Sequence, residues 1–296
     1  MLGKFTGLRC GGLVEPAALL RPVPDEGLLA AARSVAGLSS VSMLETPGSS
    51  GAFFSGFRDD RRRFMKTHRV QAASCNILKE FGLLSRLYGD VMCPLIHRVG
   101  RDGGCQNFLE MAYIEHNAPE CLEPGRMVSM TSDLAARLGP PCAVDLNYSA
   151  RDLHALAFPA LEELSAVNLI EPDVARACED SARRFADYAD SDPVVCHGDL
   201  GNENIRCRGD DLIVVDWEDS MYGPRHYDML YWLTFIAQRR YYSALLLPEI
   251  GVPRQYGVDV MVVVVLLKSY LAFLNKRHLG FRLSVSDRIR EILAIL

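Results

Sequence analysis

Polar residues that could bind a metal ion and activate a hydroxyl group gather in the segment "VVCHGDLGNENIRCRGDDLIVVDWEDS". Their order along the chain is His197, Asp199, Asn202, Asn204 and Asp216. "DPVVC" and "LIVVDW" are rich in β-branched residues, so we expect two short buried strands with a loop between them. Such a loop and the end of the second strand can direct two carboxylates and an amide oxygen to one point.

This oxygen-rich set suits a hard divalent cation such as Mg²⁺. In proteins Mg²⁺ usually keeps several waters and is held by one or two carboxylates together with the phosphates of a substrate. A carboxylate that does not bind the ion can orient a hydroxyl group and accept its proton. The order His-x-Asp, then Asn five residues after the Asp, then an Asp on a strand matches the general kinase template.

The same residues carry a resemblance to a known family. "HGDLGNEN" followed by "VVDWED" is similar to the signature of the aminoglycoside phosphotransferase and choline kinase superfamily, which is HGDLxxxN and then a D-[FW]-E strand. Gly198 stands where protein kinases have Arg, and Asp-Trp-Glu replaces Asp-Phe-Gly. Both differences favour the branch of the superfamily that acts on small molecules.

The resemblance implies a phosphate-binding lysine and a glutamate that holds it. "FMKTH" supplies Lys66 on the third predicted strand, and Glu80 follows fourteen residues later on a predicted helix. A loop between the first two strands should cover the phosphates of the nucleotide. "TPGSSGAFF" can do so with backbone N–H groups and with the hydroxyls of Ser49 and Ser50.

The resemblance also implies a strand that leads to a hinge and binds the nucleotide base. "FLEMAYIE" is similar to the family's text at this point, with Met111 as the gatekeeper. The base would then pair with main-chain groups near Ala112 and Ile114. All these features occur in the expected order along the chain, which a chance motif would not produce.

Hydrophobic periodicity predicts the elements that position these residues. We expect a helix over 23–37, strands on both sides of the "PGSSG" loop, a third strand in "RRRFMKTH" and a helix over 71–88. "MCPLIHRVG" and "QNFLEMAYIE" add two strands. The fold class expected is α+β and protein-kinase-like, with an N-terminal lobe over 1–115 built on a five-stranded antiparallel sheet and a larger, mainly helical C-terminal lobe over 116–296.

Composition narrows the class of protein. The chain has 296 residues and a formal net charge of −5, which argues against a nucleic-acid partner. Nine cysteines without a CxxC pair predict reduced thiols in the cytoplasm. We expect no signal peptide and no membrane span, because the most apolar run, "VMVVVVLL", is far shorter than the ~20 residues that a spanning helix needs.

The resemblance implies a role for each candidate. ATP or GTP would bind between the lobes, with its phosphates on Lys66, while Mg²⁺ would be held by Asn204 and Asp216. Asp199 would orient the acceptor hydroxyl and take its proton. His197 would brace the loop through the backbone, Asp228 in "YGPRHYDMLYWL" would support the fold, and Glu218 would shape the pocket.

The resemblance implies that the acceptor is a small molecule with a hydroxyl group, and its charge is suggested by the segment over 116–190. That segment carries seven carboxylates which would favour a cationic acceptor such as an aminoglycoside or an amino-alcohol: Glu120, Glu123, Asp133, Asp145, Asp152, Glu162 and Glu163. Choline-, thiamine- and sugar-type acceptors stay open. So do the oligomeric state and the choice between antibiotic resistance and ordinary metabolism.

Three other classes of protein compete with this interpretation. A pseudokinase that only binds a nucleotide or a partner would usually lack one of the catalytic residues. A metallophosphoesterase would need further clustered histidines, but the other six are scattered. A protein kinase would carry Arg in place of Gly198 and an Ala-Pro-Glu motif after Asp216.

Overall fold

The chain forms two compact units, which are described separately below. The computed structural model describes residues 23–296 except 36, 46–50, 71–75, 102–103, 116–121, 141–145, 147, 190 and 281. The described residues of 23–115 and 205–218 form the first unit, which we call the sheet unit. The described residues of 122–204 and 219–296 form the second, which we call the helical unit. The expected lobe boundary between 115 and 116 stays a prediction.

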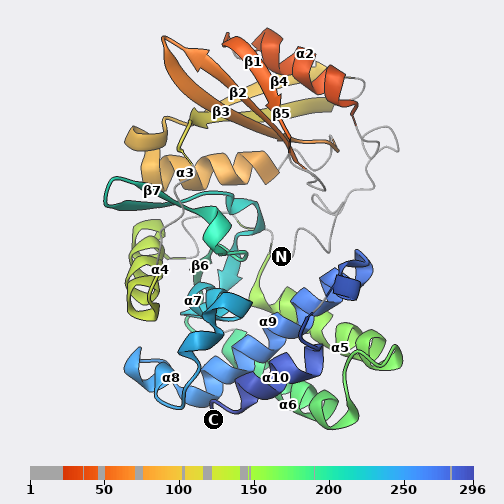
Figure 1. Ribbon diagram of the computed structural model, residues 1–296. Coiled ribbons are helices and arrows are strands. Elements are labelled where there is room, and N and C mark those ends of the chain that lie inside the picture. The colour runs from red at the N-terminus through yellow and green to blue at the C-terminus, as the bar shows by residue number, and fades with distance from the viewer. Residues whose placement is uncertain are drawn as a thin grey trace. The chain divides into compact units, whose positions relative to one another are not determined.

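The sheet unit is built on one five-stranded antiparallel sheet, as predicted (Figure 1). Its strands are β1 (Ser39–Leu44), β2 (Gly51–Arg58), β3 (Arg61–His68), β4 (Leu95–Arg101) and β5 (Gly104–Ala112). They follow the order β1-β2-β3-β5-β4. The helices α2 (Asp25–Val35) and α3 (Asn76–Met92) lie on opposite faces of this sheet (Figure 1).

Alternation along β3 decides which side chains meet which helix. Met65 belongs to the core under α2, where it is buried with Leu28, Phe54 and Phe108. Successive side chains of a strand point to opposite faces, so Lys66 points to the face that α3 covers. Full burial of each such apolar side chain contributes about 1.5–3 kcal/mol, which makes this register strongly preferred over one shifted by a single residue.

A short hairpin completes the sheet unit. It consists of β7 (Ile205–Arg208) and β8 (Asp211–Val214), and Gly209 takes a positive φ of 61° in the turn between them. The predicted second strand therefore ends at Val214, two residues before Asp216. The expectation of a single loop before that strand was wrong, because "IRCR" pairs with "DLIV" across the Gly-Asp turn.

The helical unit packs its helices around one apolar helix. In chain order its helices and strands are α4 (Pro124–Leu138), α5 (Ala150–Ala166), α6 (Pro172–Ala189), β6 (Val194–Cys196), a 3₁₀ turn (Asn202–Asn204), β9 (Met221–Gly223), α7 (Tyr227–Leu233), a 3₁₀ helix (Ile236–Tyr241), α8 (Leu246–Glu249), α9 (Arg254–Leu274), a 3₁₀ turn (Arg277–Gly280) and α10 (Val285–Leu293). The short strands β6 and β9 pair antiparallel. The predicted strand in "DPVVC" thus forms, with β9 as its partner.

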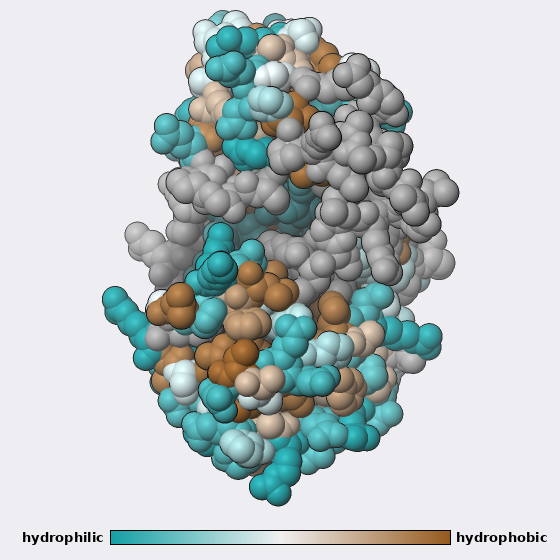
Figure 2. Space-filling view, turned by 90° about the vertical axis from the view of Figure 1, so that its right-hand side faces the viewer, coloured by the Kyte–Doolittle hydropathy of each residue, from teal (hydrophilic) through white to brown (hydrophobic). Residues whose placement is uncertain are grey.

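The apolar run "VMVVVVLL" lies in α9, which is the core helix of this unit. Every residue from Val260 to Leu267 is fully buried, and α9 packs against α5, α6 and α10. By length and composition α9 could cross a membrane, but 72% of its apolar window is buried inside the protein. On the face seen in Figure 2 the helical unit mixes apolar with polar residues and carries no continuous apolar belt.

A buried carboxylate joins four strands at one end of the sheet. Glu110 on β5 is fully buried and accepts hydrogen bonds from Arg58 Nε at 3.0 Å and Arg63 Nε at 2.9 Å, and its Oε2 lies 2.7 Å from His97 Nε2. Burial alone would raise the pKa of Glu110. The hydrogen bonds from His97, Arg58 and Arg63 outweigh burial and lower that pKa from 4.5 to about 2.

We expect Glu110→Gln to lower the free energy of unfolding by about 3 kcal/mol at pH 7, because it removes the buried negative charge that Arg63, Arg58 and His97 contact. A depressed pKa stabilises the fold above the unfolded value of 4.5, and that stability is lost as the pH falls toward 2. The difference between wild type and variant, measured by urea unfolding, should therefore narrow below pH 4.5. Glu26→Gln, an exposed position on α2, is the control, and a difference that does not change with pH would contradict the assignment.

Candidate active site

Lys66 is the centre of a buried charge cluster in the sheet unit. Its Nζ lies 2.5 Å from Glu80 Oε2 on α3 and 2.5 Å from Asp216 Oδ1, which follows β8. The Lys66 side chain is 5% exposed and that of Glu80 is fully buried. Three of the predicted residues, which stand far apart in the sequence, are therefore in contact.

This cluster keeps a positive charge ready beside an accessible carboxylate. Burial opposes the charge on Lys66, but the surrounding carboxylates, led by Asp216, raise the pKa of its amine well above the ordinary value. The Asp216 side chain is 40% exposed and offers its oxygens at the edge of the cluster. A fixed ammonium beside an open carboxylate can bind a phosphate together with its divalent cation.

The backbone after β8 holds Asp216 in an unusual conformation. Asp216 has a φ of +69°, which non-glycine residues seldom adopt. Its N–H donates a hydrogen bond to Glu80 Oε1 at 3.1 Å. Two residues earlier, the Val214 N–H donates to the Tyr88 hydroxyl at 3.1 Å. Glu80 thus binds both the amine of Lys66 and the backbone that presents Asp216.

Two residues of the cluster were not predicted. His68 Nε2 lies 2.9 Å from Glu218 Oε2, and Lys79 Nζ donates to the main-chain oxygen of Glu218. These contacts hold the residue that was expected to shape the pocket. Period-two alternation could have indicated His68, since it stands two residues after Lys66 and so on the same face of β3. No sequence pattern indicates Lys79.

In the helical unit, Asp228 on α7 holds the loop that carries Asp199. Its carboxylate accepts hydrogen bonds from the N–H groups of His197 at 2.7 Å and Gly198 at 3.0 Å. Burial raises the pKa of Asp228, although these donors oppose the shift. His197 is fully buried, and its Nδ1 accepts the Asp199 N–H at 3.3 Å, which is the kind of bracing that the resemblance implied.

The amide of Asn204 is oriented by the same loop. Its Nδ2 donates to the main-chain oxygen of Asp199 at 2.9 Å, and the side chain lies almost buried in the 3₁₀ turn. The carbonyl oxygen of the amide is then turned away from this contact and is suited to ligate a cation. The amide oxygen of Asn202, in contrast, already accepts a hydrogen bond from Trp232 Nε1 at 2.7 Å.

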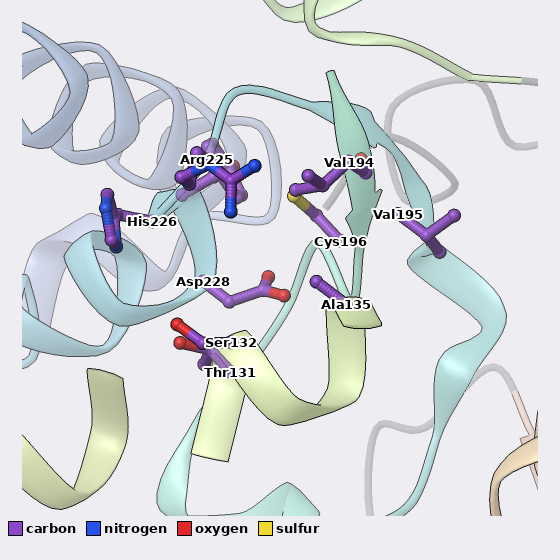
Figure 3. A pocket seen from close by; sticks show the side chains of 10 residues that line it. Thr131, Ser132, Ala135, Val194, Val195, Cys196, Arg225, His226 and Asp228 are labelled. Atoms are coloured by element: carbon purple, nitrogen blue, oxygen red, sulfur yellow. The ribbon is translucent and has the colours of Figure 1, made fainter. Parts of the chain in front are cut away.

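Two cavities border these segments. A small one of about 20 Å³ lies between α4, β6 and the start of α7, and the Asp228 carboxylate points into it (Figure 3). It has room for about one water molecule and none for a substrate. In the sheet unit, a cavity of about 330 Å³ is lined by Ala112–Glu115 and Cys207–Gly209, and the expected base-binding residues Ala112 and Ile114 border it.

The remaining predicted residues of the nucleotide site are Met111, Ser49 and Ser50. Met111 on β5 is buried and pairs in register with Phe64 on β3. Ser49 and Ser50 lie outside the described residues. Within the described ranges, no cluster of three or more His, Cys, Asp or Glu side chains could hold a metal ion. Mg²⁺ does not require such a cluster when a substrate supplies phosphate oxygens.

Gly198 cannot carry a side chain in this loop. Its φ is +83°, and a Cβ atom there would lie 2.2 Å from the main-chain oxygen of Asp219. The arginine of protein kinases is therefore excluded here by geometry. Gly251 offers a matched comparison in the same unit, because its φ is +73° and a Cβ atom there would meet nothing within 4 Å.

We expect Gly251→Ala to cost about 1 kcal/mol of unfolding free energy, which is the strain of a left-handed residue alone. Gly198→Ala should cost several times as much, because the loop must also move away from Asp219. Urea unfolding of both variants measures the difference. Equal losses in the two variants would show that the close approach to Asp219 does not constrain the loop.

Solved structures resemble this chain along most of its length. The aminoglycoside phosphotransferase APH(4)-Ia, in a ternary complex with AMP-PNP and hygromycin B, is 14% identical with a TM-score of 0.57, and the match covers 92% of this chain and 97% of that one. The spectinomycin phosphotransferase APH(9)-Ia, in complex with ADP and spectinomycin, is 12% identical with a TM-score of 0.50, covering 93% and 99%.

A protein from Thermobifida fusca assigned as a fructosamine-3-kinase is 16% identical with a TM-score of 0.52, and the match covers 90% of this chain and 98% of that one. At such identities these likenesses show the fold alone, and they confirm the expected α+β, protein-kinase-like class. No curated protein matches the sequence.

The sequence itself matches the model of one protein family. The match runs over residues 48–247, which is more than half of the chain, and the family is described as the phosphotransferase enzyme family. It spans Lys66, Glu80, Asp199, Asn204 and Asp216. The resemblance found in the signature motifs is thereby confirmed. The chain belongs to the phosphotransferase enzyme family and is a small-molecule phosphotransferase.

Proposed function

We propose that this phosphotransferase moves the γ-phosphate of ATP or GTP to a hydroxyl group of a small cationic molecule. The observation that carries the proposal is the buried ammonium of Lys66, held at 2.5 Å by both Glu80 and Asp216. A lysine confined in this way is a fixed point charge for phosphate oxygens. Two of the similar solved structures hold AMP-PNP or ADP, which supports a nucleotide as the phosphate donor.

Within this proposal each unit contributes separate groups. Lys66 binds the phosphates of the nucleotide, and Glu80 keeps the amine in place. Main-chain groups at Ala112 and Ile114 bind the base beside the cavity that they line, with Met111 behind them. Ser49 and Ser50 are retained as proposed phosphate contacts.

Asn204 and Asp216 are the proposed ligands of Mg²⁺, through the amide oxygen of one and the exposed carboxylate of the other. When bound, Mg²⁺ would offset the negative charge of the triphosphate. Asp199 orients the acceptor hydroxyl and accepts its proton as the phosphate is transferred. Catalysis of this kind depends mainly on positioning and on fixed charges.

The cationic acceptor is supported by the similar structures that hold hygromycin B and spectinomycin. The seven carboxylates of the segment over 116–190 support a cationic acceptor less than the sequence suggested, because several of them have other contacts. Asp152 caps its own helix, Asp133 lies 3.6 Å from Arg137, and Glu163 accepts the hydroxyl of Tyr270 at 2.8 Å. Glu120 and Asp145 lie outside the described residues. Glu162 is exposed and can still attract a cation, whereas Glu123, which is also exposed, takes part in a hydrogen bond with Tyr241.

A sugar-type metabolite is the second candidate acceptor, because the Thermobifida fusca neighbour is assigned as a fructosamine-3-kinase. Choline and thiamine complete the range of acceptors worth comparing. The cytoplasm is the proposed compartment, since a nucleotide-dependent kinase needs ATP or GTP at hand.

The first test measures nucleoside diphosphate release from Mg²⁺-ATP or Mg²⁺-GTP in the presence of hygromycin B, spectinomycin, choline, thiamine, fructosamine or glucose. We expect one class of acceptor to stimulate release. Asp199→Asn should lower turnover at least about 100-fold, because the general base is lost, and should leave nucleotide affinity within about twofold. Asp180→Asn, an exposed position on α6, is the matched control.

Two results would count against the proposal. If the chain binds a nucleotide but no acceptor raises release above the level of Asp199→Asn, it acts as a binding module of the pseudokinase kind. If release is stimulated equally in wild type and Asp199→Asn, then Asp199 does not serve as the base.

A separate prediction concerns the lysine. Glu80→Gln keeps the shape of the side chain and an oxygen that can accept the Asp216 N–H, but removes the charge that holds Lys66. We expect KM for the nucleotide to rise and kcat to fall about tenfold or more, since a mobile amine no longer matches the transferring phosphate. Steady-state kinetics measure both values, and unchanged kinetics would separate Glu80 from phosphate binding.

A further inference from the structure

We propose that Tyr231 is a positioning residue that fixes the orientation of the Asp199 carboxylate. The Tyr231 hydroxyl donates a hydrogen bond to Asp199 Oδ1, and both residues belong to the helical unit. Tyr231 lies on α7 and is 3% exposed. The inference deepens the proposed function, because it depends on Asp199 acting as the base.

The hydroxyl of Tyr231 can act only as a donor toward Asp199. Burial raises the pKa of Tyr231 well above its ordinary value, and the charge of Asp199 and the hydrogen bond between them raise it further. The phenol therefore stays protonated over the range in which enzymes work.

Two aromatic rings and one amine pack against the ring of Tyr231. The Phe235 ring meets it edge-on at 5.8 Å between centroids, and the Tyr227 ring lies at 6.1 Å. The amine of Lys268 on α9 lies 4.1 Å from the Tyr231 centroid and donates to Thr234 Oγ1 at 3.3 Å. A cation against the face of a phenol draws electron density from the ring, which strengthens the hydroxyl as a donor.

Helix α7 thus contacts the loop that carries Asp199 through two side chains, one of which binds the backbone and the other the Asp199 carboxylate. Asp228 binds the backbone N–H groups of His197 and Gly198, so it sets the path of the chain. Tyr231 stands three residues later, on the same face of the helix, and reaches the side chain of Asp199. The backbone contacts cannot choose a rotamer for the carboxylate, whereas the phenol can.

The consequence is specific to the chemical step. Asp199 must meet the acceptor hydroxyl as an ionised and oriented base, and orientation of this kind influences kcat more than binding. The nucleotide is bound by other residues. Loss of the Tyr231 hydroxyl should therefore reduce kcat and leave KM for the nucleotide nearly unchanged.

The decisive variant is Tyr231→Phe, which keeps the ring and its packing and removes only the hydroxyl. Tyr188→Phe is the matched control, because the Tyr188 hydroxyl also donates to a carboxylate of the helical unit, that of Asp259, at 3.4 Å. Thermal unfolding of both variants establishes that they are folded before any other comparison.

The first readout needs no substrate. In the full chain, crystal structures of the wild type, Tyr231→Phe and Tyr188→Phe are compared at the Asp199 side chain. We expect the Asp199 carboxylate to take more than one orientation in Tyr231→Phe and to keep a single orientation in the wild type and in Tyr188→Phe. A single, unchanged orientation in Tyr231→Phe overturns the inference.

The second readout uses the acceptor of the panel that gives the highest turnover. Tyr231→Phe should lower kcat about tenfold or more and change KM for the nucleotide less than twofold, whereas Tyr188→Phe should change neither. An unchanged kcat in Tyr231→Phe, with Asp199→Asn inactive, overturns the inference and leaves the proposed function standing. Loss of the single Asp199 orientation in Tyr231→Phe, without turnover of any acceptor by the wild type, contradicts the proposed function alone.

Discussion

The ammonium of Lys66, buried between Glu80 and Asp216, is the constraint on which the sheet unit depends. An uncompensated buried charge costs several kcal/mol, so β3, α3 and the segment after β8 must meet at one point. The alternation of β3 sends Lys66 toward α3, and the helical stripe brings Glu80 to the same place. Glu80 then binds the Asp216 N–H as well, so one carboxylate holds both the amine of Lys66 and the backbone of Asp216.

In the helical unit the buried charge is negative and belongs to the carboxylate of Asp228. Asp228 is buried, and its carboxylate accepts hydrogen bonds from two backbone N–H groups. Backbone donors are placed by the path of the chain, so this carboxylate specifies the path of the loop that carries Asp199. The positive φ of Gly198 and its approach to Asp219 belong to the same constraint. The hydrogen bonds to Asp228 and the close approach of Gly198 to Asp219 together constrain the backbone of the loop that carries Asp199.

Much of the sheet unit could be predicted from the sequence. The five strands, both helices and the pairing of Lys66 with Glu80 follow from alternation, helical periodicity and the family resemblance. The hairpin partner β7 was missed, because four residues with two arginines carry almost no strand signal until β8 pairs with them. The acidic segment is a weak guide to the acceptor, since composition does not separate a carboxylate that caps a helix from one that faces a ligand.

The sequence by itself determined which residues are candidates for the chemistry and in what order they occur, because a catalytic motif is local and its spacing is visible in the chain. It also determined the class of fold, through periodicities of two and of 3.6 residues. Only the tertiary structure decided what surrounds those residues: the left-handed backbone of Asp216, the histidine against Glu218, and the phenol of Tyr231 on Asp199. Such contacts join residues that are distant in sequence, and they arise from packing, to which no local pattern corresponds.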